Sequence, residues 1–112
     1  MGSSSHKIRD INDRFRAGDT SEPGQVLVTT GVQSLVDGSK SVDLASVLEA
    51  VARYDCFDVD NDPYHEHDFG CFDIQGERLF WKIDLYEEPN VNRPNEASTV
   101  TRVLTIMLAS EY

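Results

Sequence analysis

Two segments of alternating polar and apolar residues, joined by Gln75-Gly76, constrain the fold of this chain more than any other feature. They cover residues 69–74 and 77–86, and a connection this short is typical of a β-hairpin. The register that follows places Gly70 opposite Trp81, where the glycine leaves room for the indole. One face of the hairpin then carries the apolar side chains expected in the core: Phe72, Ile74, Leu79, Trp81, Ile83 and Leu85.

The opposite face of the same hairpin is mixed in character. In the predicted register Asp73 lies across from Arg78, which indicates an ion pair between the two strands. Aromatic and charged residues alternate along the rest of this face: Phe69, Cys71, Phe80, Lys82, Asp84 and Tyr86. If no helix covers it, the aromatic part (Phe69, Phe80, Tyr86) could serve as a contact between two copies of the chain.

Around the hairpin, apolar spacing predicts a helix over about 6–17, a strand over 26–30 and a second helix over about 41–54. Residues 56–67 and 87–97 are predicted to be loops. Apolar side chains at helical spacing predict a last helix over 100–108, although its β-branched residues favour a strand. The expected fold is therefore α+β, in the order α-β-α-β-β-α, with a small, mainly antiparallel sheet (central hairpin about 68–86) packed against about three helices.

A length of 112 residues allows a single domain, here residues 6–112, because residues 1–5 (MGSSS) resemble an expression-vector leader. Twenty acidic and ten basic residues give a formal net charge of -10, which argues against direct binding to nucleic acid. The two cysteines are too few for a disulfide scaffold, and neither a signal peptide nor a long apolar segment is evident. We therefore expect a cytoplasmic protein that does not associate with membranes.

Seven acidic residues lie in the segment from Asp55 to Asp73, which contains no lysine or arginine. Such a run favours solubility and attracts cations or basic proteins. If the protein has a specific binding surface, we expect it to comprise Asp55, Asp58, Asp60, Asp62, Glu66, Asp68 and Asp73. Turn chemistry explains part of the same pattern, since Asp and Asn side chains accept hydrogen bonds from nearby backbone N–H groups.

Two histidines within this segment raise the alternative of a metal site. His65 and His67 alternate along the chain and, with Asp68, could bind a divalent metal such as zinc or manganese. In a metal-dependent hydrolase, Glu66 or Asp62 would act as general base. An EF-hand is excluded, because Pro63 and Phe69 occupy the positions that require Gly and Glu.

Several strings resemble a family of small, uncharacterised bacterial proteins often found on plasmids and other mobile elements. They are NDRFR from residue 12, DNDP from residue 60, EHDFG from residue 66, FWKID from residue 80 and TRVLTIMLASEY from residue 101. The resemblance implies no catalytic residues. It also implies that glycine usually occupies the position of His65, so a metal site that needs both histidines would not be a general feature of the family.

Three functions remain open. The first is a small acidic interaction protein that binds a basic surface on a larger protein, in its most specific form an inhibitor of a host nucleic-acid-targeting defence system that acts by charge mimicry. The second is the metal-binding domain or metal-dependent hydrolase. The third is an oligomer-forming module, such as a homodimer, without a catalytic site. No nucleophile with an activating neighbour is evident, which makes an enzyme the less favoured reading.

Overall fold

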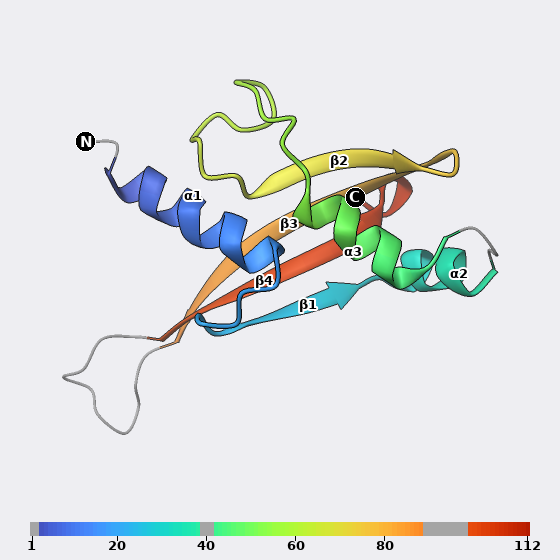
Figure 1. Cartoon of the computed structure of the whole chain (residues 1–112), viewed down its shortest axis with the longest axis horizontal. Coiled ribbons are helices and arrows are strands. Elements are labelled where there is room, and N and C mark those ends of the chain that lie inside the picture. Colours follow the sequence, from blue (N-terminus) through green and yellow to red (C-terminus); the bar gives the residue numbers. More distant parts are fainter. Residues whose placement is uncertain (1–2, 39–41, 89–98) are drawn as a thin grey trace.

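A computed structural model describes residues 3–38, 42–88 and 99–112 (Figure 1). These described residues form three α-helices, four strands and a 3-10 turn. In order these are α1 (Ser3–Arg16), β1 (Gly24–Val28), α2 (Thr30–Gly38), α3 (Leu44–Ala52), β2 (Phe69–Ile74), β3 (Glu77–Glu88), β4 (Thr99–Leu108) and η1 (Ala109–Glu111). The α+β class is confirmed, whereas the predicted order of elements is wrong.

The four strands form one mixed sheet in the order β1-β4-β3-β2. β2, β3 and β4 are antiparallel to their neighbours, and β1 pairs parallel to β4 with Val26 beside Leu104. β1 and β2 are consequently the two edge strands. They lie at opposite sides of the sheet in Figure 1.

The predicted C-terminal helix is strand β4, which is hydrogen-bonded between β1 and β3. The alternating residues Leu104 and Ile106 point toward the helices, while Val103 and Met107 point to the other face, and all four are buried. A central strand that is apolar on both faces also places apolar residues at helical spacing. The β-branched residues of this segment were therefore the better guide to its structure.

The sequence analysis also missed a helix, α2, directly after β1. Val32, Leu35 and Val36 give it a short apolar stripe that packs against the core. The Thr29 hydroxyl accepts a hydrogen bond from the Val32 N–H at 3.4 Å and so caps the first turn. The next helix, α3, is shorter than predicted and begins after Asp43, whose carboxylate accepts a hydrogen bond from the Ser46 N–H.

The hairpin register is confirmed residue by residue. Gly70 pairs with Trp81, and the Asp73 carboxylate accepts a hydrogen bond from Arg78 Nε at 2.9 Å. Of the side chains expected in the core, Leu79, Trp81 and Ile83 are buried, and Phe72 and Ile74 pack against that core. Leu85 is 44% exposed and lines an open hollow with Ile8 and Ile11 of α1.

All three α-helices contribute to one hydrophobic core on the Trp81 face of the sheet. Among the described residues, no α-helix contributes to the opposite face, where Phe69 and Phe80 pack against each other and against Tyr112. Within the described parts of the chain, helices thus cover the sheet on one side only. The contact between two copies through the aromatic side, predicted above for Phe69, Phe80 and Tyr86, remains a prediction.

Several sequence predictions fall at the limits of the described residues. Most of the predicted loop over 87–97 lies outside them, except that Glu87 and Glu88 extend β3. The predicted start of the second helix at Ser41 and the first two leader residues also lie outside. Within the described parts of the chain, no helix combines the length and the apolar character that a membrane span requires.

Candidate functional site

The acidic segment between α3 and β2 rises beyond the β2 edge of the sheet, on the side away from β1 (Figure 1). A turn at Asp58–Asn61 shapes its tip. The Asp58 carboxylate accepts hydrogen bonds from the N–H groups of Asp60 and Asn61 at 2.9 and 3.0 Å. The Asn61 side chain accepts one from the Asp58 N–H and donates one to the Cys56 carbonyl. The turn chemistry predicted for Asn61 is therefore confirmed, and Asp58, for which it was not predicted, takes part in the same turn.

Asp62 lies inside the loop rather than on its surface. Only 2% of the residue is exposed, and its carboxylate accepts hydrogen bonds from the N–H groups of Glu66 and His67, both at 3.0 Å. Its second oxygen lies 3.5 Å from His67 Nε2. Asp62 thus holds the returning half of the loop and cannot present its charge to a partner.

His67 connects the loop to α1. Its Nδ1 lies 2.9 Å from one carboxylate oxygen of Asp13, and its ring stacks on Phe57 with 3.7 Å between the ring centroids. Carboxylates therefore face both ring nitrogens, those of Asp13 and Asp62.

Arg16 contacts the same oxygen of Asp13, Oδ1, that lies closest to His67 Nδ1. The guanidinium donates to Asp13 at 2.8 Å and to the carbonyl oxygens of Val51 and Tyr54 at 2.5 and 3.2 Å. It also lies over the Trp81 ring, 4.7 Å from the centroid, in a cation–π arrangement. Because Arg16 is only 7% exposed, these contacts form in the interior, where charge-assisted hydrogen bonds are strong.

A third residue of α1 completes the connection. The Asn12 amide donates to the Glu66 carbonyl at 3.0 Å, and its oxygen accepts a hydrogen bond from Arg102 Nε of β4 at 2.9 Å. Partial burial lowers the pKa of the Arg102 guanidinium. We refer to Asn12, Asp13, Arg16, Asp62 and His67 as the anchor cluster, since together they attach the acidic loop to α1, α3 and the sheet.

Sequence reasoning did not assign a role to the α1 members of this cluster. Asn12, Asp13 and Arg16 lie in the string NDRFR, which attracted notice only as part of a family resemblance. Asp13 and Arg16 are three positions apart and so share one side of the helix with Asn12 and Phe15 nearby. The polar residues around Phe15 in this string could have indicated a polar contact of α1. Their contacts could not be predicted, because His67, the partner of Asp13, is 54 positions away.

The remaining acidic residues of the predicted binding surface are accessible to different degrees. Asp55, Asp58 and Asp60 are exposed, and Glu66 and Asp68 are half-buried. Burial raises the pKa of the Asp68 carboxyl, and repulsion from Asp62 adds to the effect. The pKa of Glu66 is raised for the same reasons, with Asp68 and Asp62 as the repelling charges. Asp73 is exposed but forms its ion pair with Arg78.

The metal site predicted for His65, His67 and Asp68 has no counterpart in this arrangement. His65 is exposed, and His67 is directed toward Asp13 and Asp62. In the part of the chain that the structure describes, no three His, Cys, Asp or Glu side chains are placed to hold a metal ion together.

The backbone at His65 makes a prediction possible. Its φ angle is 57°, in the left-handed region where a Cβ atom costs about 1–2 kcal/mol. Glycine removes this cost but loses about 0.5–1 kcal/mol through its greater freedom in the unfolded chain. We therefore expect His65→Gly to keep or raise the free energy of unfolding, measured by urea denaturation. His65→Ala retains the Cβ atom and should give no gain in the free energy of unfolding. A His65→Gly variant less stable than His65→Ala would contradict the left-handed backbone conformation at this position.

Comparison with known protein families finds a match over residues 28–111 to the family described as "Protein of unknown function (DUF3768)". The chain belongs to this family. The resemblance seen in the sequence is thereby confirmed at the level of a family of unknown function. No curated protein and no solved structure shows a significant match.

The DUF3768 match includes the whole acidic loop but begins after α1 and most of β1. Asp62 and His67 of the anchor cluster therefore lie inside the matched region, whereas Asn12, Asp13 and Arg16 lie before it. In this DUF3768 protein, the loop is held by residues from both parts of the chain.

Proposed function

We propose that this protein binds a basic surface on a larger protein through its acidic loop. The proposed contact surface consists of Asp55, Asp58, Asp60, Glu66 and Asp68. No lysine or arginine occurs between Arg53 and Arg78, and the chain as a whole carries a net charge of -10. Negative charge concentrated in this way accelerates encounter with a positively charged partner and selects against acidic ones.

The observation that carries this proposal is the way the loop is held. Asp62 and His67 tie its base to α1, and Asp58 and Asn61 form its tip, while Asp55 and Asp60 face outward. Among the described residues, no lysine or arginine forms an ion pair with Asp55 or Asp60. A loop that is already ordered loses little conformational entropy on binding, so more of its interaction energy contributes to affinity.

The repulsion within the loop supports the same function. Burial is the main cause of the raised pKa values of Glu66 and Asp68, and repulsion from neighbouring carboxylates adds to it. Lysine or arginine side chains of a partner would relieve this repulsion. The mechanism would be competition: the acidic loop occupies a basic site that otherwise holds nucleic acid. An inhibitor of a nucleic-acid-targeting defence system is the most specific form of this proposal.

A pull-down from bacterial lysate tests the proposal when it compares two variants of equal net charge. Asp55→Asn with Asp60→Asn removes two outward charges from the loop. Asp37→Asn with Glu77→Gln removes two charges from α2 and from the far end of the hairpin. We expect a protein retained by the wild type and by the remote variant to be lost from the loop variant by about tenfold or more, as measured by quantitative mass spectrometry.

Salt provides the control for electrostatic binding. The retained protein should elute as the salt concentration rises, because screening weakens attraction between exposed charges. Equal losses from the two variants would show that net charge alone matters, and retention insensitive to salt would contradict an electrostatic contact.

A further inference from the structure

The outer side of edge strand β1 carries unpaired backbone groups. The Pro23 carbonyl accepts a hydrogen bond from the Arg102 N–H, and the Thr29 N–H donates to the Ile106 carbonyl. Alternate residues of a strand direct their N–H and C=O groups to opposite sides, so odd-numbered residues here face β4. The outward-facing residues of β1 are therefore Gly24, Val26 and Val28. Among the described residues, no strand pairs with them.

This edge differs from the rest of the molecule in charge. Residues 23–36 contain no charged side chain, in a protein whose net charge is -10. At the other edge, β2 carries Asp73 and follows directly on the acidic loop. Two copies that approached through β2 would bring carboxylates together, whereas an approach through β1 avoids this repulsion. The β1 edges of two copies can therefore approach each other without repulsion between charged side chains of residues 23–36.

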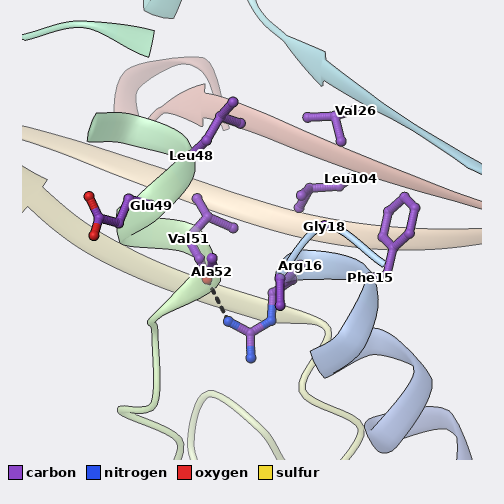
Figure 2. A pocket seen from close by; sticks show the side chains of 10 residues that line it. Phe15, Arg16, Gly18, Val26, Leu48, Glu49, Val51, Ala52 and Leu104 are labelled. Carbon is purple, nitrogen blue, oxygen red and sulfur yellow. Dashed lines mark hydrogen bonds between the residues drawn. The ribbon is translucent and has the colours of Figure 1, made fainter. Parts of the chain in front are cut away.

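β1 is also apolar and accessible on both faces. Val26 is 47% exposed and Leu27 is 45% exposed. On the helix side, Val26 and Leu104 line a hollow of about 320 Å³ together with Phe15 and Leu48 (Figure 2). On the other side, Leu27 lines a second hollow, of about 280 Å³, with Gln25, Tyr86, Thr101 and Val103. An added strand would place its alternate side chains beside these two hollows.

We propose that a second copy of this chain pairs with β1, antiparallel, about a twofold axis at Val26. In this register Val26 pairs with Val26 of the other copy, and Gly24 pairs with Val28 of the other copy. These are the outward-facing residues, so each pair exchanges its N–H and C=O groups and no outward group of the strand is left over. The two sheets become one continuous sheet, and its neutral centre separates the two acidic loops.

Solution mass measurements test the dimer. The wild type should have the mass of two 12.6 kDa chains in sedimentation equilibrium. Val26→Pro removes an outward N–H without disturbing the hydrogen bonds to β4, since proline is tolerated where an edge strand faces solvent. We expect this variant to be monomeric and Val26→Thr, which keeps the N–H and the β-branched shape, to remain dimeric. A wild type that is monomeric up to about 0.5 mM, or a Val26→Pro dimer, would overturn the proposal.

Cross-linking tests the register without a variant that weakens pairing. Gln25 of one copy should lie opposite Leu27 of the other at a non-hydrogen-bonded pair, where side chains are close. In a Cys56→Ser background, a mixture of Gln25→Cys and Leu27→Cys proteins should form a disulfide-linked dimer under mild oxidation. Each variant alone should cross-link several-fold more slowly. Equal rates for the mixture and the separate variants would contradict the twofold at Val26.

Discussion

Replacement of Arg16 by methionine should destabilise the protein by about 1.5–3 kcal/mol, the range for hydrogen bonds to a charged group, since Arg16 is buried whereas the Asp13 side chain is 38% exposed. Methionine retains most of the aliphatic volume but none of the hydrogen bonds. The carbonyl oxygens of Val51 and Tyr54 would lose a donor in the interior, and Asp13 would lose its cation. The anchor cluster would then hold the acidic loop less firmly.

Urea denaturation followed by tryptophan fluorescence is the appropriate measurement, because Trp81 is the only tryptophan and lies beneath the Arg16 guanidinium. Arg14→Met on the exposed side of the same helix serves as the control, with an expected change within about 0.5 kcal/mol. The stability of Arg16→Lys should lie between those of Arg16→Met and Arg14→Met, since lysine keeps the charge but not the planar set of donors. Equal stabilities of Arg16→Met and Arg14→Met would show that the buried contacts contribute little.

Addition of a single methyl group at Gly70 should destabilise the protein by about 1–3 kcal/mol. A Cβ atom at this position would lie 2.5 Å from the Trp81 Nε1 atom and 2.7 Å from atoms of the Tyr54 ring. Both rings belong to the packed interior, where Tyr54 and Trp81 meet edge to face with 5.5 Å between centroids. One ring must therefore move for alanine to be accommodated.

Double-mutant analysis tests whether Trp81 is the ring that must move. Trp81→Phe shortens the side chain next to Gly70 and removes an indole N–H that finds no acceptor among the described residues. The cost of Gly70→Ala, measured by urea denaturation and circular dichroism, should accordingly be smaller in a Trp81→Phe background. Gly38→Ala, where nothing lies within 4 Å of the added atom, is the control. Additive effects of the two changes at Gly70 and Trp81 would contradict this account.

The sequence predicted those parts of the structure that depend on neighbouring residues. The hairpin register follows from a two-residue turn and strict alternation, and the Asp58–Asn61 turn follows from side chains that bond to backbone a few residues away. β4 was predicted wrongly because its two buried faces also satisfy a helical pattern. Its structure is decided by pairing with β1 and β3, which no local pattern encodes.

The anchor cluster shows the same limit within the candidate site. The acidic run indicated where the charge lies, but not that Asp62 would be buried or that His67 would contact Asp13. These contacts join segments that are distant in sequence, and a polar residue on a helix lies more often on a solvated surface than in such a network. The structure therefore separates the outward carboxylates, Asp55, Asp58 and Asp60, from the structural Asp62.

The position of β4 has a consequence for how the chain acquires its fold. β4 is the last of the four described strands along the chain, yet it supplies the pairing partner for β1, the first of them, and for the long strand β3. Before β4 has been synthesised, only the β2–β3 hairpin and local helices can form. The backbone groups of β1 that face β4 then remain unpaired. Pairing between strands that are distant in sequence favours slow folding, and the unpaired strands make the incomplete chain prone to aggregation. Formation of the complete sheet therefore requires the last of its four strands along the chain.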